Sequence, residues 1–176
     1  PNGVIMDSEM VTCAQVCFDD VNNSPPMTEV HVEEKLHIPS IHTECYGTPD
    51  FWGLAPNYIY LWDYKFGHRD VPADSWQNIC YVAGILDHLH ANGLDDQNLN
   101  VVMTIVQPRS YSSEGPVKRW EGKASDLRAP INILMAQAAK AYEIDPGVQS
   151  GNHCRDCEAR HICPAARHAA AAAVDY

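Results

Sequence analysis

The feature that most constrains this chain is a pair of extended segments on either side of a short turn at residues 55–57. One segment covers residues 42–54 and the other residues 58–66. Proline and asparagine in the turn favour a reversal of the chain, and the aromatic and β-branched residues around it favour strands. Two strands joined by so short a connection form an antiparallel hairpin. Each residue before the turn is therefore expected to face a fixed partner after it.

Three charged residues mark this expected hairpin: Asp50 on the first segment, and Asp63 and Lys65 on the second. Side chains two apart on a strand share a face, so Asp63 and Lys65 point the same way. Asp50 is expected about 5 Å to the side, on the neighbouring strand. Two carboxylates so close repel unless a cation lies between them, and a hard divalent ion such as Mg²⁺ or Mn²⁺ fits oxygen ligands. In the alternative reading, Asp50 closes a turn, and Asp63 and Lys65 form a surface ion pair.

The remaining sequence predicts helices and strands around the hairpin. Apolar periodicity and capping residues predict helices from Asp7 or Ser8 to about residue 22, over 76–90, and from residue 125 or 126 to 143. Extended segments are predicted over 28–38 and 101–106. This order predicts an α/β core with a central mixed sheet flanked by helices, over residues 1–150. A cysteine-rich helical tail follows over residues 151–176.

The charge of the chain opposes a nucleic-acid partner. Lys and Arg number 12 against 23 Asp and Glu, a net charge of −11, whereas contacts with phosphates normally come from a basic surplus. A metal ion would neutralise acidic residues gathered around it, and an absent segment could carry basic residues. Pro1 in place of a methionine, and an alanine run that stops at Tyr176, predict a chain cut from something longer.

No membrane partner is expected, because no apolar run approaches the roughly 18 to 20 residues of a membrane helix. The N-terminus also lacks the layout of a signal peptide. Without secretory signals, the 7 cysteines indicate a reducing, cytoplasmic compartment, bacterial or in a phage-infected host. Cys45 and Cys80 are read as buried apolar residues.

Three motifs in order are similar to those of the RecB-type nuclease family, within the PD-(D/E)xK superfamily. They are Gly47-Thr48-Pro49-Asp50, Asp63-Tyr64-Lys65 and Gln77-x-x-x-Tyr81. The last pair lies on one face of a helix. The resemblance implies a catalytic lysine, Lys65, and metal ligation by Asp50, Asp63 and the backbone carbonyl of Tyr64. It also implies that Gln77 and Tyr81 flank the site. Glu33 matches a further acidic position near the metal, with Glu34 as its competitor.

The resemblance further implies a restriction-endonuclease-like core and a metal-dependent DNA exonuclease, which hydrolyses phosphodiesters with a metal-activated water. Such an enzyme would act in recombination or repair, be encoded by a phage or prophage, and possess a helicase or recombination partner. One alternative is a catalytically inactive nuclease-fold protein that binds DNA or a partner and holds a structural metal. A third reading is a site-specific endonuclease of the same superfamily.

A cysteine triplet near the C-terminus, Cys154-x2-Cys157-x5-Cys163, is typical of a metal or cluster site. It resembles the triplet of the iron-sulfur branch of the RecB-type nucleases, which implies a [4Fe-4S] cluster. A zinc site completed by His153 and unoccupied thiols are the alternatives.

The family's upstream cysteine and first-motif histidine should precede the opening helix, where this sequence has none. Cys13 and Cys17 could substitute for that cysteine, but their positions fit the apolar stripe of the helix, and we expect core residues.

Overall fold

The computed structural model describes residues 5–94 and 98–174, so Pro1 and Tyr176, at the two expected cut ends, lie outside the described residues. The chain forms two compact units, Pro1–Met135 and Ala136–Tyr176. The cysteine-rich segment 151–176 lies within the second unit.

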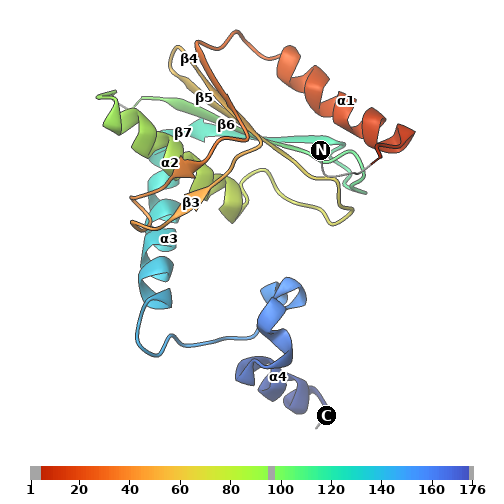
Figure 1. Ribbon diagram of the computed structural model, residues 1–176, viewed down its shortest axis with the longest axis vertical. Coiled ribbons are helices and arrows are strands. Elements are labelled where there is room, and N and C mark those ends of the chain that lie inside the picture. The colour runs from red at the N-terminus through yellow and green to blue at the C-terminus, as the bar shows by residue number, and fades with distance from the viewer. Residues whose placement is uncertain (1–4, 95–97, 175–176) are drawn as a thin grey trace. The chain divides into compact units, whose positions relative to one another are not determined.

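A five-stranded mixed sheet forms the centre of the first unit (Figure 1). Among its described strands, β5 (Tyr58–Tyr64) and β6 (Asn100–Val106) form the only parallel pair of neighbours, and α2 (Trp76–Ala91) connects them as a crossover helix. A separate two-stranded ladder joins β2 (Leu36–His37) and β3 (Tyr46–Gly47). In spatial order the sheet contains β1 (Glu29–Val32), β4 (Phe51–Ala55), β5 (Tyr58–Tyr64), β6 (Asn100–Val106) and β7 (Val117–Lys123). The predicted mixed α/β fold is confirmed.

The predicted hairpin is present as β4 and β5. Ala55 pairs with Tyr58 at the turn, and Phe51 pairs with Trp62 at the open end. Asn57 has a φ of 64°, and asparagine is one of the few residues other than glycine that adopt this left-handed conformation readily. The sequence therefore sets both the turn and the register.

Helices cover both faces of the sheet. α1 (Ser8–Asn22) begins at Asp7, whose carboxylate accepts a hydrogen bond from the Met10 amide at 2.8 Å, and α2 begins at Ser75, whose hydroxyl accepts from the Asn78 amide. Both helices agree with their predicted spans. α3 (Arg128–Ala141) follows a short 3-10 turn over Ala124–Leu127, with Pro130 in its first turn.

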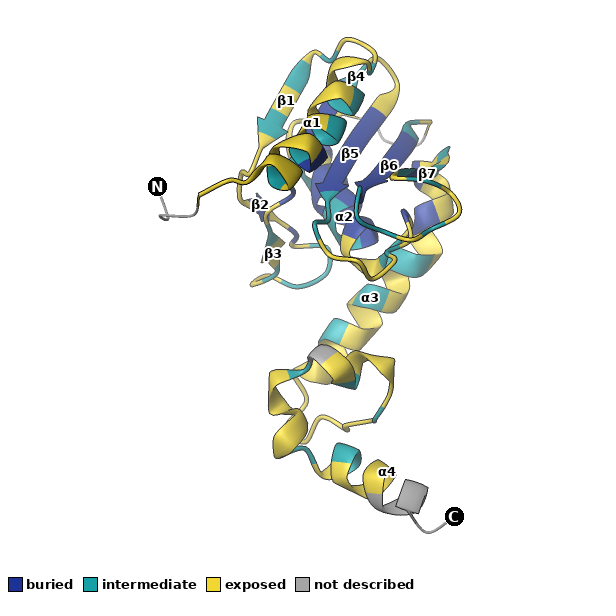
Figure 2. Ribbon diagram, turned by 90° about the vertical axis from the view of Figure 1, so that its right-hand side faces the viewer, coloured by how far each residue is buried: buried dark blue, intermediate teal, exposed yellow. Residues whose placement is uncertain are grey.

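Two apolar clusters form the core, one on each face of the sheet. β5 and β6 contribute to both clusters, which explains why they are buried throughout most of their lengths (Figure 2). The cluster under α2 includes Trp52, Leu54, Ile59, Leu61, Ile79, Val82, Ile85, Val101 and Met103. The cluster under α1 includes Val16, Cys17, Val21, Tyr60, Trp62, Val102 and Val106. Cys13 is buried and Cys17 is half-buried, so both belong to the packed part of α1, as expected.

Two predictions about strands are wrong, and one further strand lacks a prediction. The segment 28–38 is not one strand, because Glu33 has a φ of 49° and separates β1 from β2. The segment 42–54 is likewise divided into β3 and β4, and Asp50 precedes β4 rather than lying within it. β7 was not predicted at all. Its outward-facing charged residues and its place at the sheet edge give it little apolar signal.

The second unit contains the end of α3, two short 3-10 turns at Asn152–Asp156 and Glu158–His161, and α4 (Pro164–Val174). The three cysteines of the tail triplet are half-buried here. Across the described parts of both units, no helix combines the length and the apolar character needed to cross a membrane.

Candidate active site

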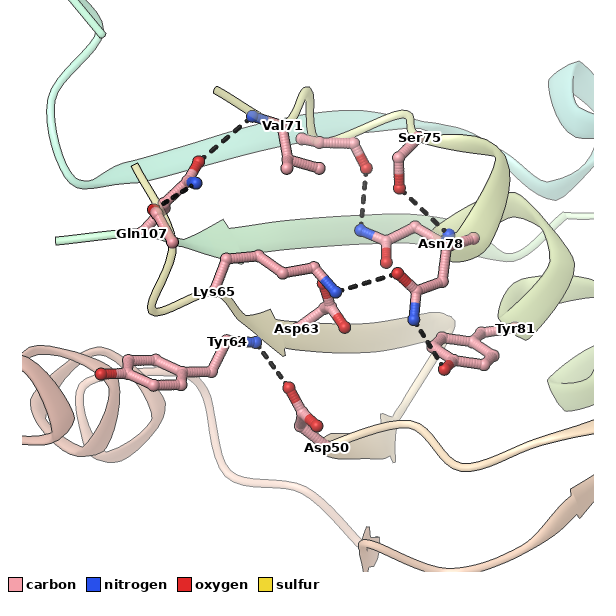
Figure 3. A network of polar contacts seen from close by, with 12 residues as sticks. Asp50, Asp63, Tyr64, Lys65, Val71, Ser75, Asn78, Tyr81 and Gln107 are labelled. Carbon is pink, nitrogen blue, oxygen red and sulfur yellow. Dashed lines mark hydrogen bonds and ion pairs between the residues drawn. The ribbon is translucent and has the colours of Figure 1, made fainter. Parts of the chain in front are cut away.

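The hairpin brings Asp50 and Asp63 to the same end of the β4–β5 ladder. Phe51 and Trp62 form the last pair of this ladder, Asp50 directly precedes Phe51, and Asp63 directly follows Trp62. The Asp50 carboxylate accepts a hydrogen bond from the backbone N–H of Tyr64 at 2.6 Å, which holds it against the end of β5 (Figure 3). Both carboxylates therefore lie at the open end of the hairpin.

Asp63 is a buried carboxyl group, with 2% of the residue exposed. Burial raises the pKa of Asp63 above its usual range. The nearby Lys65 ammonium opposes this shift in pKa, and the negative charge of Asp50 adds to it. Lys65 Nζ forms an ion pair with Asp63 Oδ2 at 2.7 Å. The predicted sharing of one strand face by these two side chains is confirmed.

A chain of polar contacts connects Lys65 to α2. Lys65 Nζ donates a hydrogen bond to Gln77 Oε1 at 2.9 Å, and Gln77 Nε2 donates to the Tyr81 hydroxyl at 2.9 Å (Figure 3). Gln77 and Tyr81 are one helical turn apart, as their spacing predicts. The lysine is thereby held between a carboxylate of the sheet and an amide of the helix.

The loop between Lys65 and α2 is fixed by Gln107, which sequence reasoning missed. Gln107 is 1% exposed, and its amide donates to the Gly67 carbonyl at 2.8 Å and accepts from the Val71 amide at 3.1 Å (Figure 3). A buried polar side chain must find such partners. The one available signal was a glutamine placed directly after the apolar run 101–106.

Glu33 and Tyr64 lie close to Asp50 through their backbones. The Glu33 amide donates to the Asp50 carbonyl at 3.1 Å, while the Glu33 side chain is exposed. Glu34 instead contacts His31 Nδ1 at 2.8 Å. Among the described residues, Glu33 does not form a three-ligand group with Asp50 and Asp63. The structure thus brings Asp50, Asp63, Lys65, Gln77 and Tyr81 together, with only the Glu33 backbone beside them.

The donor set at the end of the hairpin suits a hard divalent cation. Asp63 Oδ2 is fully buried and forms an ion pair with Lys65. A buried carboxylate oxygen in this condition has acceptor capacity left. The opposing Asp50 carboxylate supplies further oxygen, the ligand type that Mg²⁺ and Mn²⁺ prefer.

Two other groups of potential ligands are present. Glu29, His31 and His88 meet between β1 and α2, a cluster that sequence reasoning missed, although Glu29 and His31 have the i, i+2 spacing of a shared strand face. The tail triplet lies in the second unit, where the Gly151 amide donates to Cys154 Sγ at 3.3 Å.

Comparison with known proteins gives a family but no activity. No curated protein matches the chain. Solved structures that match include one described as "Crystal structure of SSO0001", with 13% identity and a TM-score of 0.43. The match covers 89% of this chain, which spans 66% of the length of that one. A family model described as "Protein of unknown function (DUF2800)" matches residues 4–176, almost the whole sequence. The chain therefore belongs to the DUF2800 family.

Proposed function

We propose that this protein is a metal-dependent DNA nuclease of the RecB type, with a restriction-endonuclease-like core, and that it acts as an exonuclease in DNA recombination or repair. One observation carries the proposal: Asp50, Asp63 and Lys65 converge at the open end of one hairpin. The hydrogen bonds from Lys65 to Gln77 and from Gln77 to Tyr81 support it, because they connect the third motif of the resemblance to the lysine of the second motif.

Asp50 and Asp63 would hold Mg²⁺ or Mn²⁺, together with the Tyr64 carbonyl. When bound, such an ion polarises a phosphoryl oxygen and lowers the pKa of a water molecule. The Lys65 side chain is 25% exposed, so its ammonium can meet negative charge that develops on a phosphate in the transition state. Gln77 positions Lys65, and Tyr81 positions Gln77.

The charge of the site makes a metal requirement part of the proposal. Two carboxylates and a DNA phosphate repel one another, and Lys65 supplies a single positive charge against them. A divalent ion would add two positive charges and so offset the excess of negative charge at the site. With a net charge of −11 for the chain, we expect weak DNA binding in EDTA and stronger binding with the metal.

The tail triplet is proposed to hold a [4Fe-4S] cluster, with zinc as the alternative. Cys154, Cys157 and Cys163 are half-buried in one unit, and the hydrogen bond from the Gly151 amide to Cys154 Sγ would stabilise a thiolate at that position. Bound there, a cluster or a zinc ion would supply a structural link among the turns of the tail. Elemental analysis of anaerobically prepared protein for iron and zinc distinguishes the two.

The activity is tested by incubating linear single- and double-stranded DNA with the protein and Mn²⁺ or Mg²⁺. We expect degradation that EDTA abolishes. Lys65→Ala should lower the rate by about 10²–10³-fold, and Asp63→Ala at least as much. Lys140→Ala is the matched control, because it removes one positive charge from an exposed position of α3. Closed circular DNA should survive an exonuclease and be cut by an endonuclease.

The proposal fails if the wild-type protein degrades no DNA with either metal, or if Lys65→Ala degrades it as fast as Lys140→Ala does. Fluorescence anisotropy with labelled DNA then separates the remaining outcomes. Metal-dependent binding without cleavage would indicate a catalytically inactive DNA-binding protein of the nuclease fold.

A further inference from the structure

Three side chains from two elements that are distant in sequence meet on the sheet face covered by α2. Glu29 and His31 come from β1 and His88 comes from α2. His31 Nε2 lies 2.7 Å from Glu29 Oε1, and His88 Nε2 lies 3.0 Å from the same oxygen. One ligand atom from each lies within 4.8 Å of the other two. Within the described residues, no other three His, Cys, Asp or Glu side chains meet this criterion.

The surrounding aromatic groups hold both imidazoles in place. His31 is the ladder partner of Trp52, and its ring stacks on the indole with centroids 4.0 Å apart and an interplanar angle of 7°. His88 meets both rings edge-on, at 5.4 Å from Trp52 and 5.6 Å from His31. Trp52 is buried in the core under α2. The two ring orientations are thus fixed by packing before any ligand binds.

A fourth residue, Glu34, orients His31 by contacting the ring nitrogen that does not face Glu29. Glu34 Oε2 lies 2.8 Å from His31 Nδ1. Histidines that ligate metals commonly donate their second ring N–H to a carboxylate in this way, which fixes the tautomer and makes the ligating nitrogen more basic. With Nδ1 committed to Glu34, Nε2 of His31 is the ring nitrogen directed at Glu29 and His88.

We propose that Glu29, His31 and His88 form a binding site for a transition-metal ion, with Zn²⁺ as the preferred occupant. Two imidazoles and one carboxylate are a ligand set that zinc accepts, whereas Mg²⁺ prefers oxygen ligands throughout. The side chains of Glu29 and His88 are 40% and 31% exposed, which leaves an open side for a solvent molecule. Zinc sites with three protein ligands keep the fourth coordination position for a water molecule or a substrate.

Binding requires only local movement. The ligand atoms now touch one another directly, and metal-ligand distances of about 2.0–2.2 Å need them to separate slightly around the ion. The Asn92 side-chain amide lies 3.2 Å from His88 Nε2 and also contacts the His88 carbonyl. Asn92 is exposed at the end of α2, so its amide can rotate away. The metal would displace a proton from each ring nitrogen that is protonated when the site is empty.

The ion would cross-link β1 to α2, because its ligands come from both elements. β1 is an edge strand of four residues, and edge strands have hydrogen-bonding partners on one side only. A metal that joins two of its side chains to the helix stabilises the folded state by mass action. Zinc should therefore raise the thermal unfolding temperature. This site does not use Asp50, Asp63 or Lys65, so the inference stands independently of nuclease activity.

The test uses the full chain in a background that removes the competing ligands. Cys154, Cys157 and Cys163 are changed to serine and Asp63 to asparagine, and the protein is treated with EDTA and dialysed. Zn²⁺ titration by calorimetry should then show one equivalent bound. Glu34→Gln should weaken binding by about 10–100-fold, and His88→Ala and Glu29→Gln should weaken it further. His37→Ala, at an exposed histidine of β2, is the matched control.

A second readout identifies the ligands and guards against misfolding. Co²⁺ bound in this background should show weak d–d absorption without a thiolate charge-transfer band, and the absorption should disappear in His88→Ala. Thermal unfolding in EDTA checks that each variant folds. The inference is overturned if the background protein binds no Zn²⁺, or if folded His88→Ala binds it as tightly as His37→Ala does. Either result would mean that Glu29, His31 and His88 form an ion-pair network and not a metal site.

Discussion

Lys65 Nζ lies 2.7 Å from Asp63 Oδ2, two residues earlier on β5. The strand alone sets this proximity, but the second partner of the lysine, Gln77, belongs to α2 and lies 2.9 Å from the same nitrogen. The ammonium is held between an anion and a neutral amide, and with 25% of the side chain exposed it still faces solvent. The proposed catalytic group is therefore positioned by tertiary structure before any substrate arrives.

Asp63→Asn should stabilise the metal-free protein while abolishing DNA cleavage. Burial raises the pKa of Asp63 above its usual range, so the ionised form is less favourable in the folded state than in the unfolded state. At neutral pH the amide removes that cost, and Lys65 keeps its hydrogen bond to Gln77. We expect a gain of about 1 kcal/mol in the free energy of unfolding.

Urea unfolding in EDTA at pH 7 measures this gain, and Asp74→Asn, at an exposed residue before α2, controls for the loss of one negative charge. A variant less stable than wild type would mean that the Lys65 ion pair outweighs the cost of burying the carboxylate.

Gln77→Ala should lower nuclease activity more than Tyr81→Phe. Gln77 contacts Lys65 directly, whereas Tyr81 acts through Gln77. Loss of the amide frees the ammonium to move, and a misplacement of about 1 Å at a reacting group can cost about 10²-fold in rate. Because both are positioning residues, kcat should fall while the metal concentration needed for half-maximal activity stays unchanged. Equal losses of nuclease activity in both variants would contradict the idea that Tyr81 acts through Gln77.

The hairpin and its site could be predicted from sequence because the information is local. The turn 55–57 sets the register, strand alternation places Asp63 beside Lys65, and helical spacing places Gln77 beside Tyr81. Each of these relations spans only a few residues or a single tight turn. The bounds of α1 and α2 followed from capping residues and apolar stripes for the same reason.

What the sequence did not reveal depends on long-range contacts. Gln107 contacts backbone groups 36 to 40 residues away, and His88 meets Glu29 from 59 residues away. Glu33 breaks its predicted strand through a backbone conformation that its residue type disfavours. β7 carries charged residues, and its strand state depends on pairing with β6. None of these contacts produces a periodic pattern along the chain.

Asp70→Asn should destabilise the protein at neutral pH but not in acid. Asp70 forms an ion pair with the buried ammonium of Lys118, and Ser110 donates to the same carboxylate oxygen at 3.1 Å. The hydrogen bond from Lys118 lowers the pKa of Asp70 below its usual range. A carboxyl group with a lowered pKa adds stability above its unfolded pKa of about 3.9, and this stability is lost as the pH falls through the folded pKa.

The difference in unfolding temperature between wild type and Asp70→Asn should accordingly be present at pH 7 and shrink steadily below about pH 4. Circular dichroism melts across this range measure it. A difference that stays constant with pH would show that the variant acts through something other than the charge of Asp70.

Gly47→Ala should destabilise the protein through Tyr81. A Cβ added at Gly47, in β3, would lie 2.4 Å from Tyr81 Cε1 and 2.9 Å from Cδ1, so the ring must move. Overpacking of this kind costs about 1–3 kcal/mol, and displacement of the ring would also disturb the hydrogen bond from Gln77. Gly67→Ala is the matched control, because nothing lies within 4 Å of its added Cβ. A double-mutant cycle isolates the clash: Gly47→Ala should cost far less in a Tyr81→Ala background. An equal cost in both backgrounds, measured by urea unfolding, would place the strain in the β2–β3 ladder rather than at the ring.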